Sequence, residues 1–176
     1  MINLAIIIFI VFLKFAIPAA IVFFPFLAGW ANFILDTIDG DILIPLGLKN
    51  PTYQLIDKLA DWTTYLGMIL AAWRFKWDIK KWIYGLFSFR SIGQLLFLIF
   101  KNELLLFYFP NFLEPLFLIY ATIFFFKKTK TYSFYLKYKW LIWIFVFVYK
   151  MQDEYITHVA NVDRSELIKG LLDKIF

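Results

Sequence analysis

The stretch DTIDGDILIPLGLKNPTYQLIDKLAD, residues 36–61, decides how this chain is interpreted, because it places four aspartates in an otherwise apolar sequence. Asp36 and Asp39 stand three residues apart, and Asp57 and Asp61 stand four apart. Either spacing puts both side chains on one face of a helix. Two neighbouring helices would therefore direct four carboxylates into one pocket.

The composition outside this stretch is that of a membrane protein. Of the 176 residues 62% are hydrophobic and 23% aromatic, whereas soluble domains are about 45–50% apolar. The mean hydropathy is +0.73. Cysteine is absent and His158 is the one histidine, which excludes disulfides and thiolate chemistry and disfavours a histidine zinc site. The net charge of +5 fits loops that face anionic lipid and gives no indication of nucleic-acid binding.

These features predict an all-α, polytopic transmembrane bundle in the plasma or inner membrane, with five to six membrane helices and a short C-terminal amphipathic helix. We assign residues 1–151 to the transmembrane domain and residues 152–176 to a soluble tail. Within the tail, Asp163 and Glu166 form a capping-box-like start for the amphipathic helix.

Prolines and basic runs mark the expected breaks between helices. The first apolar segment is expected to be a partial helix that bends near Pro18. Residues 45–52 predict a loop by their Pro, Gly and Asn content. One span is expected over residues 104–126, bent by its two prolines, and residues 127–139 are expected to form a basic loop.

Four carboxylates in an apolar region need compensating charge. An aspartate at the centre of a membrane helix costs about 2.5–3.5 kcal/mol, and neighbouring carboxylates also repel one another. Such a cluster persists at the water interface or around bound cations. Without cysteine and with one histidine, oxygen ligands predict a hard cation, namely Mg²⁺, Mn²⁺ or Ca²⁺. Two such ions held by bridging carboxylates commonly serve phosphoryl transfer.

The spacing of the motif resembles the signature of the CDP-alcohol phosphotransferases, D-x2-D-G-x2-A-R-x8-G-x3-D-x3-D. Five core positions match without a gap: Asp36, Asp39, Gly40, Asp57 and Asp61. The text LIDKLAD at residues 55–61 is similar to the family's usual LDxxAD run, and Arg90 stands where the family often has an arginine in the following helix. The resemblance covers roughly residues 18–100.

By this resemblance the four aspartates would bind two divalent cations, Mg²⁺ or Mn²⁺, and Asp61 would be the general base on the acceptor alcohol. Gly40 would let the donor pyrophosphate approach the backbone, and Arg90 would bind a substrate phosphate. The implied function is a membrane transferase of phospholipid biosynthesis that moves a substituted phosphate group from a CDP-linked donor to an alcohol acceptor. The implied partners are the lipid bilayer and these substrates, with no nucleic acid, and a homodimer is left open.

Three positions depart from the signature, because Leu43 and Ile44 replace its Ala-Arg pair and Tyr53 replaces its glycine. In the family the small residues leave room for the cytidine nucleotide, and the arginine helps to hold the donor. The alternative interpretation is therefore a catalytically degenerate relative, a scaffold or partner subunit with a retained cation site. A third interpretation, cation transport, would need a polar path across the bilayer, and the chain has few internal polar residues to build one.

Overall fold

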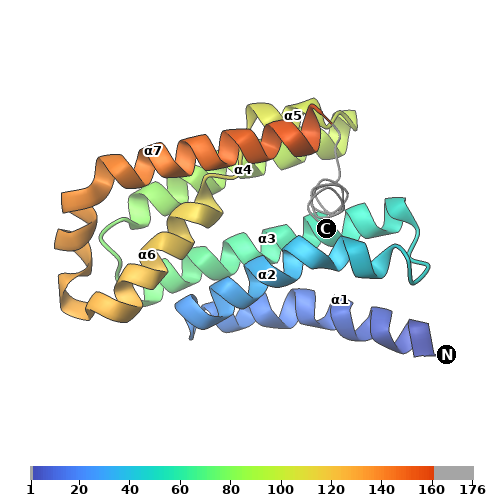
Figure 1. Cartoon of the computed structure of the whole chain (residues 1–176), viewed down its shortest axis with the longest axis horizontal. Helices are drawn as coiled ribbons and strands as arrows, with labels where there is room; N and C mark the ends of the chain where they lie inside the picture. Colours follow the sequence, from blue (N-terminus) through green and yellow to red (C-terminus); the bar gives the residue numbers. More distant parts are fainter. Residues whose placement is uncertain (1, 161–176) are drawn as a thin grey trace, which may run out of the picture.

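The computed structural model describes residues 2–160, and within this range all regular structure is helical (Figure 1). In chain order the elements are α1 (Ile2–Ile21), α2 (Pro25–Leu43), α3 (Asn50–Arg74), α4 (Lys80–Phe100), α5 (Leu104–Tyr108), α6 (Leu113–Lys127), the single 3-10 turn η1 (Lys128–Lys130) and α7 (Thr131–His158). The predicted all-α class is confirmed. The predicted C-terminal amphipathic helix lies outside the described residues.

Two of the described helices are long and apolar enough to cross a membrane. They are Asn3–Ile21, with a hydropathy of 2.7, and Lys80–Phe100, with a hydropathy of 1.6. A helix of 19 to 21 residues is about 30 Å long, which matches the hydrocarbon core of a bilayer. The described residues thus supply two candidate spans, fewer than the five to six that the sequence predicts.

The helices form two groups that share α6. On one side α1 packs against both α2 and α3, and on the other side α6 packs against both α4 and α7 (Figure 1). The first half of α6 is buried and packs against α2, α3, α4 and α7. Its Leu116, Phe117 and Tyr120 join Met68 of α3 and Ile83 of α4 in one apolar core. This core fixes the relative positions of the helices that carry the aspartates.

The break between the first two helices lies at residues 22–24 and not at Pro18, where the sequence predicts the first helix to bend. Pro18 is inside α1, which continues to Ile21. Phe24 leaves helical geometry, with φ −128° and ψ 65°, and Pro25 then starts α2. A residue that precedes proline is disfavoured in the α region, whereas proline is well suited to the first turn of a helix. Pro25 therefore marks the start of the second helix. Packing of α1 against α2 and α3 keeps α1 helical through Pro18.

The second half of the chain also differs from the expected breaks. The predicted single span over 104–126 is divided into α5 and α6, because the chain leaves helical geometry at Phe109 and Pro110. Pro115 is tolerated because it lies in the first turn of α6. The predicted basic loop over 127–139 is wrong, since η1 and the first part of α7 occupy it. Helix α7 also continues past the predicted domain boundary at residue 151, as far as His158.

A close contact between α1 and α3 fixes where along α3 the residues of α1 lie, and thus which of them reach the aspartates. A Cβ added to Gly67 of α3 would lie 2.5 Å from the carbonyl oxygen of Pro18. Only glycine allows the two backbones to approach so closely. One turn before Pro18, α1 carries Lys14, the single charged residue between residues 1 and 35. The contact therefore holds Lys14 against α2 and α3.

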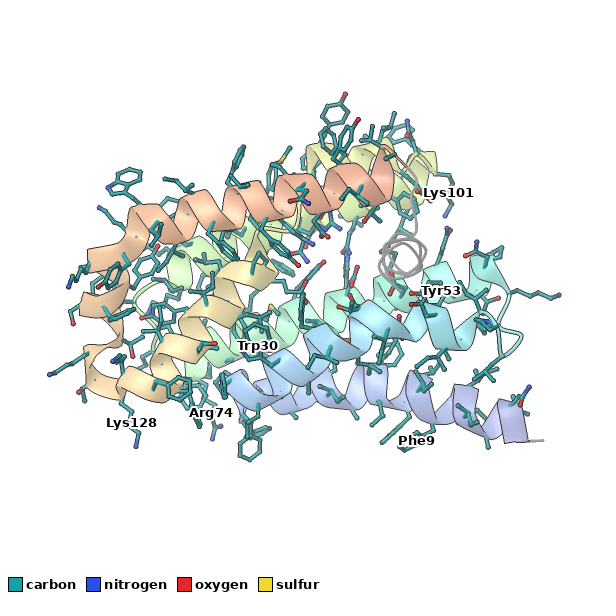
Figure 2. The ribbon with its side chains drawn as sticks, viewed as in Figure 1. Phe9, Trp30, Tyr53, Arg74, Lys101 and Lys128 are labelled. Atoms are coloured by element: carbon teal, nitrogen blue, oxygen red, sulfur yellow. The ribbon has the colours of Figure 1, made fainter. Side chains whose placement is uncertain are left out.

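The outer surface of the bundle is rich in large apolar side chains. Phe9 points away from the bundle on the outer side of α1 and is 60% exposed (Figure 2). Leu27, Trp73 and Leu141, which come from three other helices, are each more than 60% exposed. Such a surface on several helices is unusual for a protein surrounded by water.

Candidate metal centre

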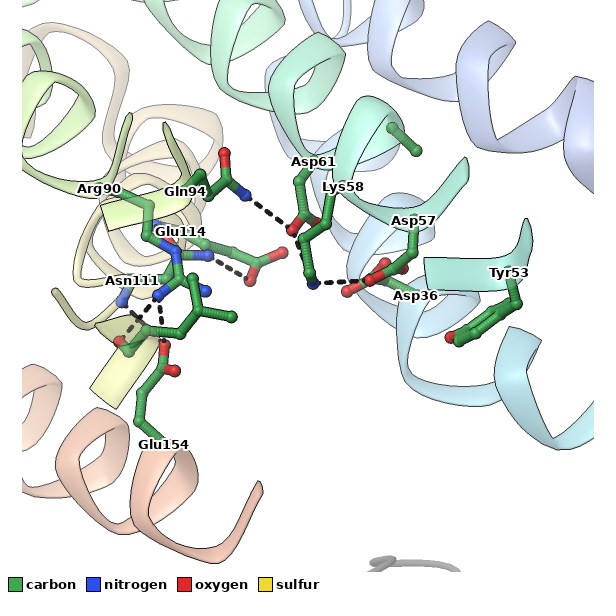
Figure 3. A network of polar contacts seen from close by, with 12 residues as sticks. Asp36, Tyr53, Asp57, Lys58, Asp61, Arg90, Gln94, Asn111, Glu114 and Glu154 are labelled. Carbon is green, nitrogen blue, oxygen red and sulfur yellow. Dashed lines mark hydrogen bonds and ion pairs between the residues drawn. The ribbon is translucent and has the colours of Figure 1, made fainter. Parts of the chain in front are cut away.

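Three of the four predicted aspartates come together where the C-terminal part of α2 faces the N-terminal part of α3, and Asp61 lies beside them (Figure 3). Asp36, Asp39 and Asp57 each offer one carboxylate oxygen, and these oxygens lie within 4.8 Å of one another. Asp39 is fully buried, while the side chain of Asp36 is 38% exposed. The group therefore has a buried side and a side that is accessible from outside.

Lys14 of α1 reaches this group of three carboxylates. Its ammonium nitrogen lies 2.7 Å from Oδ1 of Asp57 and 3.3 Å from Oδ1 of Asp36, and it also pairs with Oδ2 of Asp39. The Lys14 side chain is only 3% exposed. A buried ammonium group is stable only when opposite charges surround it. Lys14 and the three aspartates thus compensate one another.

The fourth aspartate, Asp61, lies next to the group of three and has its own partners. Lys58 connects it to the group, because its ammonium nitrogen lies 2.7 Å from Oδ2 of Asp57 and 3.4 Å from Oδ2 of Asp61. Gln94 of α4 donates its side-chain amide to the same Asp61 oxygen at 3.0 Å. Gln94 is fully buried, and its amide oxygen has no hydrogen-bond partner among the described residues.

Tyr53 covers the glycine of the motif. Its hydroxyl donates a hydrogen bond of 2.9 Å to Oδ1 of Asp39, and the same hydroxyl oxygen lies 2.9 Å from the position that a Cβ on Gly40 would take. Leu43 is fully buried, whereas Ile44 is 43% exposed. The backbone of Gly40, where a donor pyrophosphate would approach by the family resemblance, is therefore in contact with the Tyr53 side chain.

Arg90 belongs to a second polar cluster, which lies on the other side of Gln94 (Figure 3). Its guanidinium nitrogen Nη1 donates to the carbonyl oxygens of Leu106 and Phe109 at 3.1 and 2.8 Å. The same nitrogen lies 3.4 Å from Oε1 of Glu154 in α7. Glu154 also accepts a hydrogen bond of 2.9 Å from the backbone N–H of Asn111. In this structure Arg90 therefore joins α4 to α5, to the connection between α5 and α6, and to α7.

The carboxylates suit a divalent cation of the oxygen-binding class. Two oxygens on opposite sides of an ion lie about 4.2 Å apart around Mg²⁺ and about 5 Å apart around Ca²⁺. The spacing of up to 4.8 Å among three oxygens is therefore compatible with one ion of this class after small side-chain movements. The unpartnered oxygen of Gln94 is a further buried ligand atom beside Asp61.

No family model, curated protein or solved structure matches this chain. The resemblance to the CDP-alcohol phosphotransferases thus depends on the residues of the motif alone.

Four partners of the aspartates were not predicted from the sequence: Lys14, Tyr53, Lys58 and Gln94. Lys14 had a recognisable signal, because a lone charge in an apolar helix is expected to face a partner inside the protein. Lys58 follows Asp57 directly and gave no periodic signal, and the position of Gln94 depends on how α4 packs against α3.

Proposed function

We propose that this protein crosses the bilayer several times and carries its acidic site between membrane helices. The two candidate spans support this, as do the large exposed apolar side chains on other helices. The 19, 25 and 28 residues of α2, α3 and α7 give lengths of about 28 Å or more at 1.5 Å per residue. Multi-pass insertion would place these apolar surfaces against lipid tails instead of water.

We further propose that the site transfers a substituted phosphate group from a CDP-linked donor to an alcohol acceptor. The observation that carries this proposal is the convergence of three carboxylate oxygens from two helices within 4.8 Å, with Asp61 beside them. Asp36, Asp39, Asp57 and Asp61 would hold Mg²⁺ or Mn²⁺. When bound, these cations supply positive charge next to the phosphate oxygens.

The residues of the chain would then act on the acceptor. Asp61, oriented by the amide of Gln94, accepts the proton of the acceptor hydroxyl. The hydroxyl oxygen forms a bond to the donor phosphorus, the bond from that phosphorus to the CMP oxygen breaks, and CMP leaves. Donor binding at Gly40 requires the Tyr53 side chain to move, because it now covers that glycine.

The test is the release of CMP by the purified protein in detergent with Mn²⁺ or Mg²⁺, using CDP-diacylglycerol and soluble CDP-alcohols as donors. We expect CMP release that is lost in Asp61→Asn and retained in Asp41→Asn, which removes a neighbouring carboxylate outside the motif. If no donor gives cation-dependent CMP release, or if Asp61→Asn keeps it, the proposed reaction is wrong.

A second candidate is a catalytically degenerate relative that acts as a scaffold or partner subunit. It is favoured by Tyr53, whose hydroxyl contacts both Asp39 and the surface of Gly40, and by the burial of Leu43. A wild-type protein that binds Mn²⁺ without releasing CMP would support this candidate. CMP release that appears only in Tyr53→Gly would support it as well, because it would identify Tyr53 as the obstacle to the donor.

A further inference from the structure

The position of Lys14 shows how the site is balanced without a metal ion. The three carboxylates that offer oxygens to a cation are the same three that pair with the Lys14 ammonium group. A divalent cation and the ammonium group therefore compete for one place. Both cannot occupy it, because like charges a few Å apart in a partly buried site repel strongly.

We propose that Lys14 is an internal counter-ion that holds the place of one divalent cation and must leave before that cation binds. This inference rests on the cation site of the proposed function and adds its regulation. Lys14 is the only charged side chain that α1 contributes. Its exchange for a cation thus couples the occupancy of the site to the contact of α1 with α2 and α3.

Two features near Lys14 would allow its side chain to move away from the carboxylates when a cation binds. Its stem is a flexible four-carbon chain, and Asp36, one of its partners, has a side chain that is 38% exposed. The Tyr53 ring lies on another side, with its centroid 5.6 Å from the ammonium nitrogen. An ammonium group near an aromatic ring is attracted to it. The displaced Lys14 ammonium group can therefore move toward the exposed side at Asp36 or stay against the Tyr53 ring.

The experiment compares Lys14→Met with Lys49→Met, an exposed lysine at the start of α3 that gives the same net charge. Mn²⁺ binding is measured by electron paramagnetic resonance of the free ion, and thermal unfolding is followed with and without Mn²⁺. We expect Lys14→Met to bind Mn²⁺ at least about tenfold more tightly than wild type, since the repulsion of the ammonium group is removed. Lys49→Met should bind it as wild type does.

Stability gives a readout that does not depend on catalysis. Without Mn²⁺, Lys14→Met should unfold at a lower temperature than wild type, because the carboxylates lose their counter-ion. Mn²⁺ should raise its Tm more than it raises that of wild type. A variant that stays unfolded or equally unstable in Mn²⁺ contradicts the proposal, as does equal affinity in Lys14→Met and wild type. Lys14→Arg, which keeps the charge, should bind Mn²⁺ no more tightly than wild type, and tighter binding would also overturn the proposal.

The outcomes separate this inference from the proposed reaction. Tighter Mn²⁺ binding by Lys14→Met without any CMP release would keep the counter-ion role and reject the transferase. Equal Mn²⁺ binding together with CMP release would reject the counter-ion role alone. If neither protein binds Mn²⁺, there is no cation site, and both proposals fail.

Discussion

Replacing Arg90 by methionine should destabilise the protein strongly. The change removes two hydrogen bonds to backbone carbonyls and the ion pair with Glu154. Both charged side chains are at most 5% exposed, and removing one partner of a buried pair costs about 3–5 kcal/mol. Lys150 remains 3.8 Å from Glu154 and limits the loss, so we take about 3 kcal/mol. For a protein of this size, 1 kcal/mol shifts Tm by about 2–4 °C, which gives a fall of about 6–12 °C.

Thermal unfolding in detergent measures this change, and a double-variant cycle assigns it to the pair. Lys81→Met, an exposed lysine on the same helix, is the control and should leave Tm within about 2 °C. Arg90→Met combined with Glu154→Leu should recover at least about half of the lost Tm, because replacing both members of a buried pair by apolar residues is often tolerated. Effects that simply add, or a fall in Tm below about 2 °C for Arg90→Met, would refute the reasoning. Unchanged stability with weaker binding of a CDP-linked donor would favour the phosphate-binding role that the family resemblance implies for Arg90.

Further predictions concern the backbone. Gly67→Ala should lower Tm by about 2–12 °C, since overpacking costs about 1–3 kcal/mol, 1 kcal/mol shifts Tm by about 2–4 °C, and the new Cβ would meet the Pro18 carbonyl oxygen. Its matched control is Gly85→Ala, which has open space around its Cβ and should raise Tm slightly, because alanine favours a helix interior by about 0.5–1 kcal/mol. Lys101→Gly should also raise Tm above that of wild type. Lys101→Ala is the matched control, and its Tm should lie below that of Lys101→Gly. Residue 101 ends α4 with a φ of 53°, a conformation that favours glycine over other residues by about 1 kcal/mol.

The helical class could be predicted from the sequence because long apolar segments are typical of membrane helices. The meeting of Asp36 and Asp39 with Asp57 and Asp61 could also be predicted, since their spacings and the short loop between them constrain two neighbouring helices. Residues 44–49 are too few to carry the start of α3 far from the end of α2. Helix spacing and loop length are local properties, and local properties are what a single sequence expresses most clearly.

The breaks between helices and the partners of the aspartates could not be predicted in the same way. Pro18 and Pro25 carry the same local preference, and only the packing of α1 against Gly67 explains why the helix continues through Pro18. Lys14 lies 22 residues before Asp36 and 43 before Asp57, and Gln94 lies 33 residues after Asp61. Contacts between residues so far apart in the sequence depend on how the helices pack. The pattern of apolar residues is compatible with many different packing arrangements.

The two polar clusters share α4, because Gln94 contacts Asp61 and Arg90 contacts Glu154. Arg90 and Gln94 stand four residues apart and therefore lie on one face of the helix. Within the described residues, Oε1 of Gln94 is buried without a hydrogen-bond partner, while the amide of the same side chain donates to Asp61. An unmade buried hydrogen bond costs about 1–3 kcal/mol. A ligand of the proposed site that donates a hydrogen bond to this oxygen, or a cation that binds it, would remove that cost. Gln94 should therefore be tested together with the aspartates, by measuring Mn²⁺ binding in Gln94→Leu.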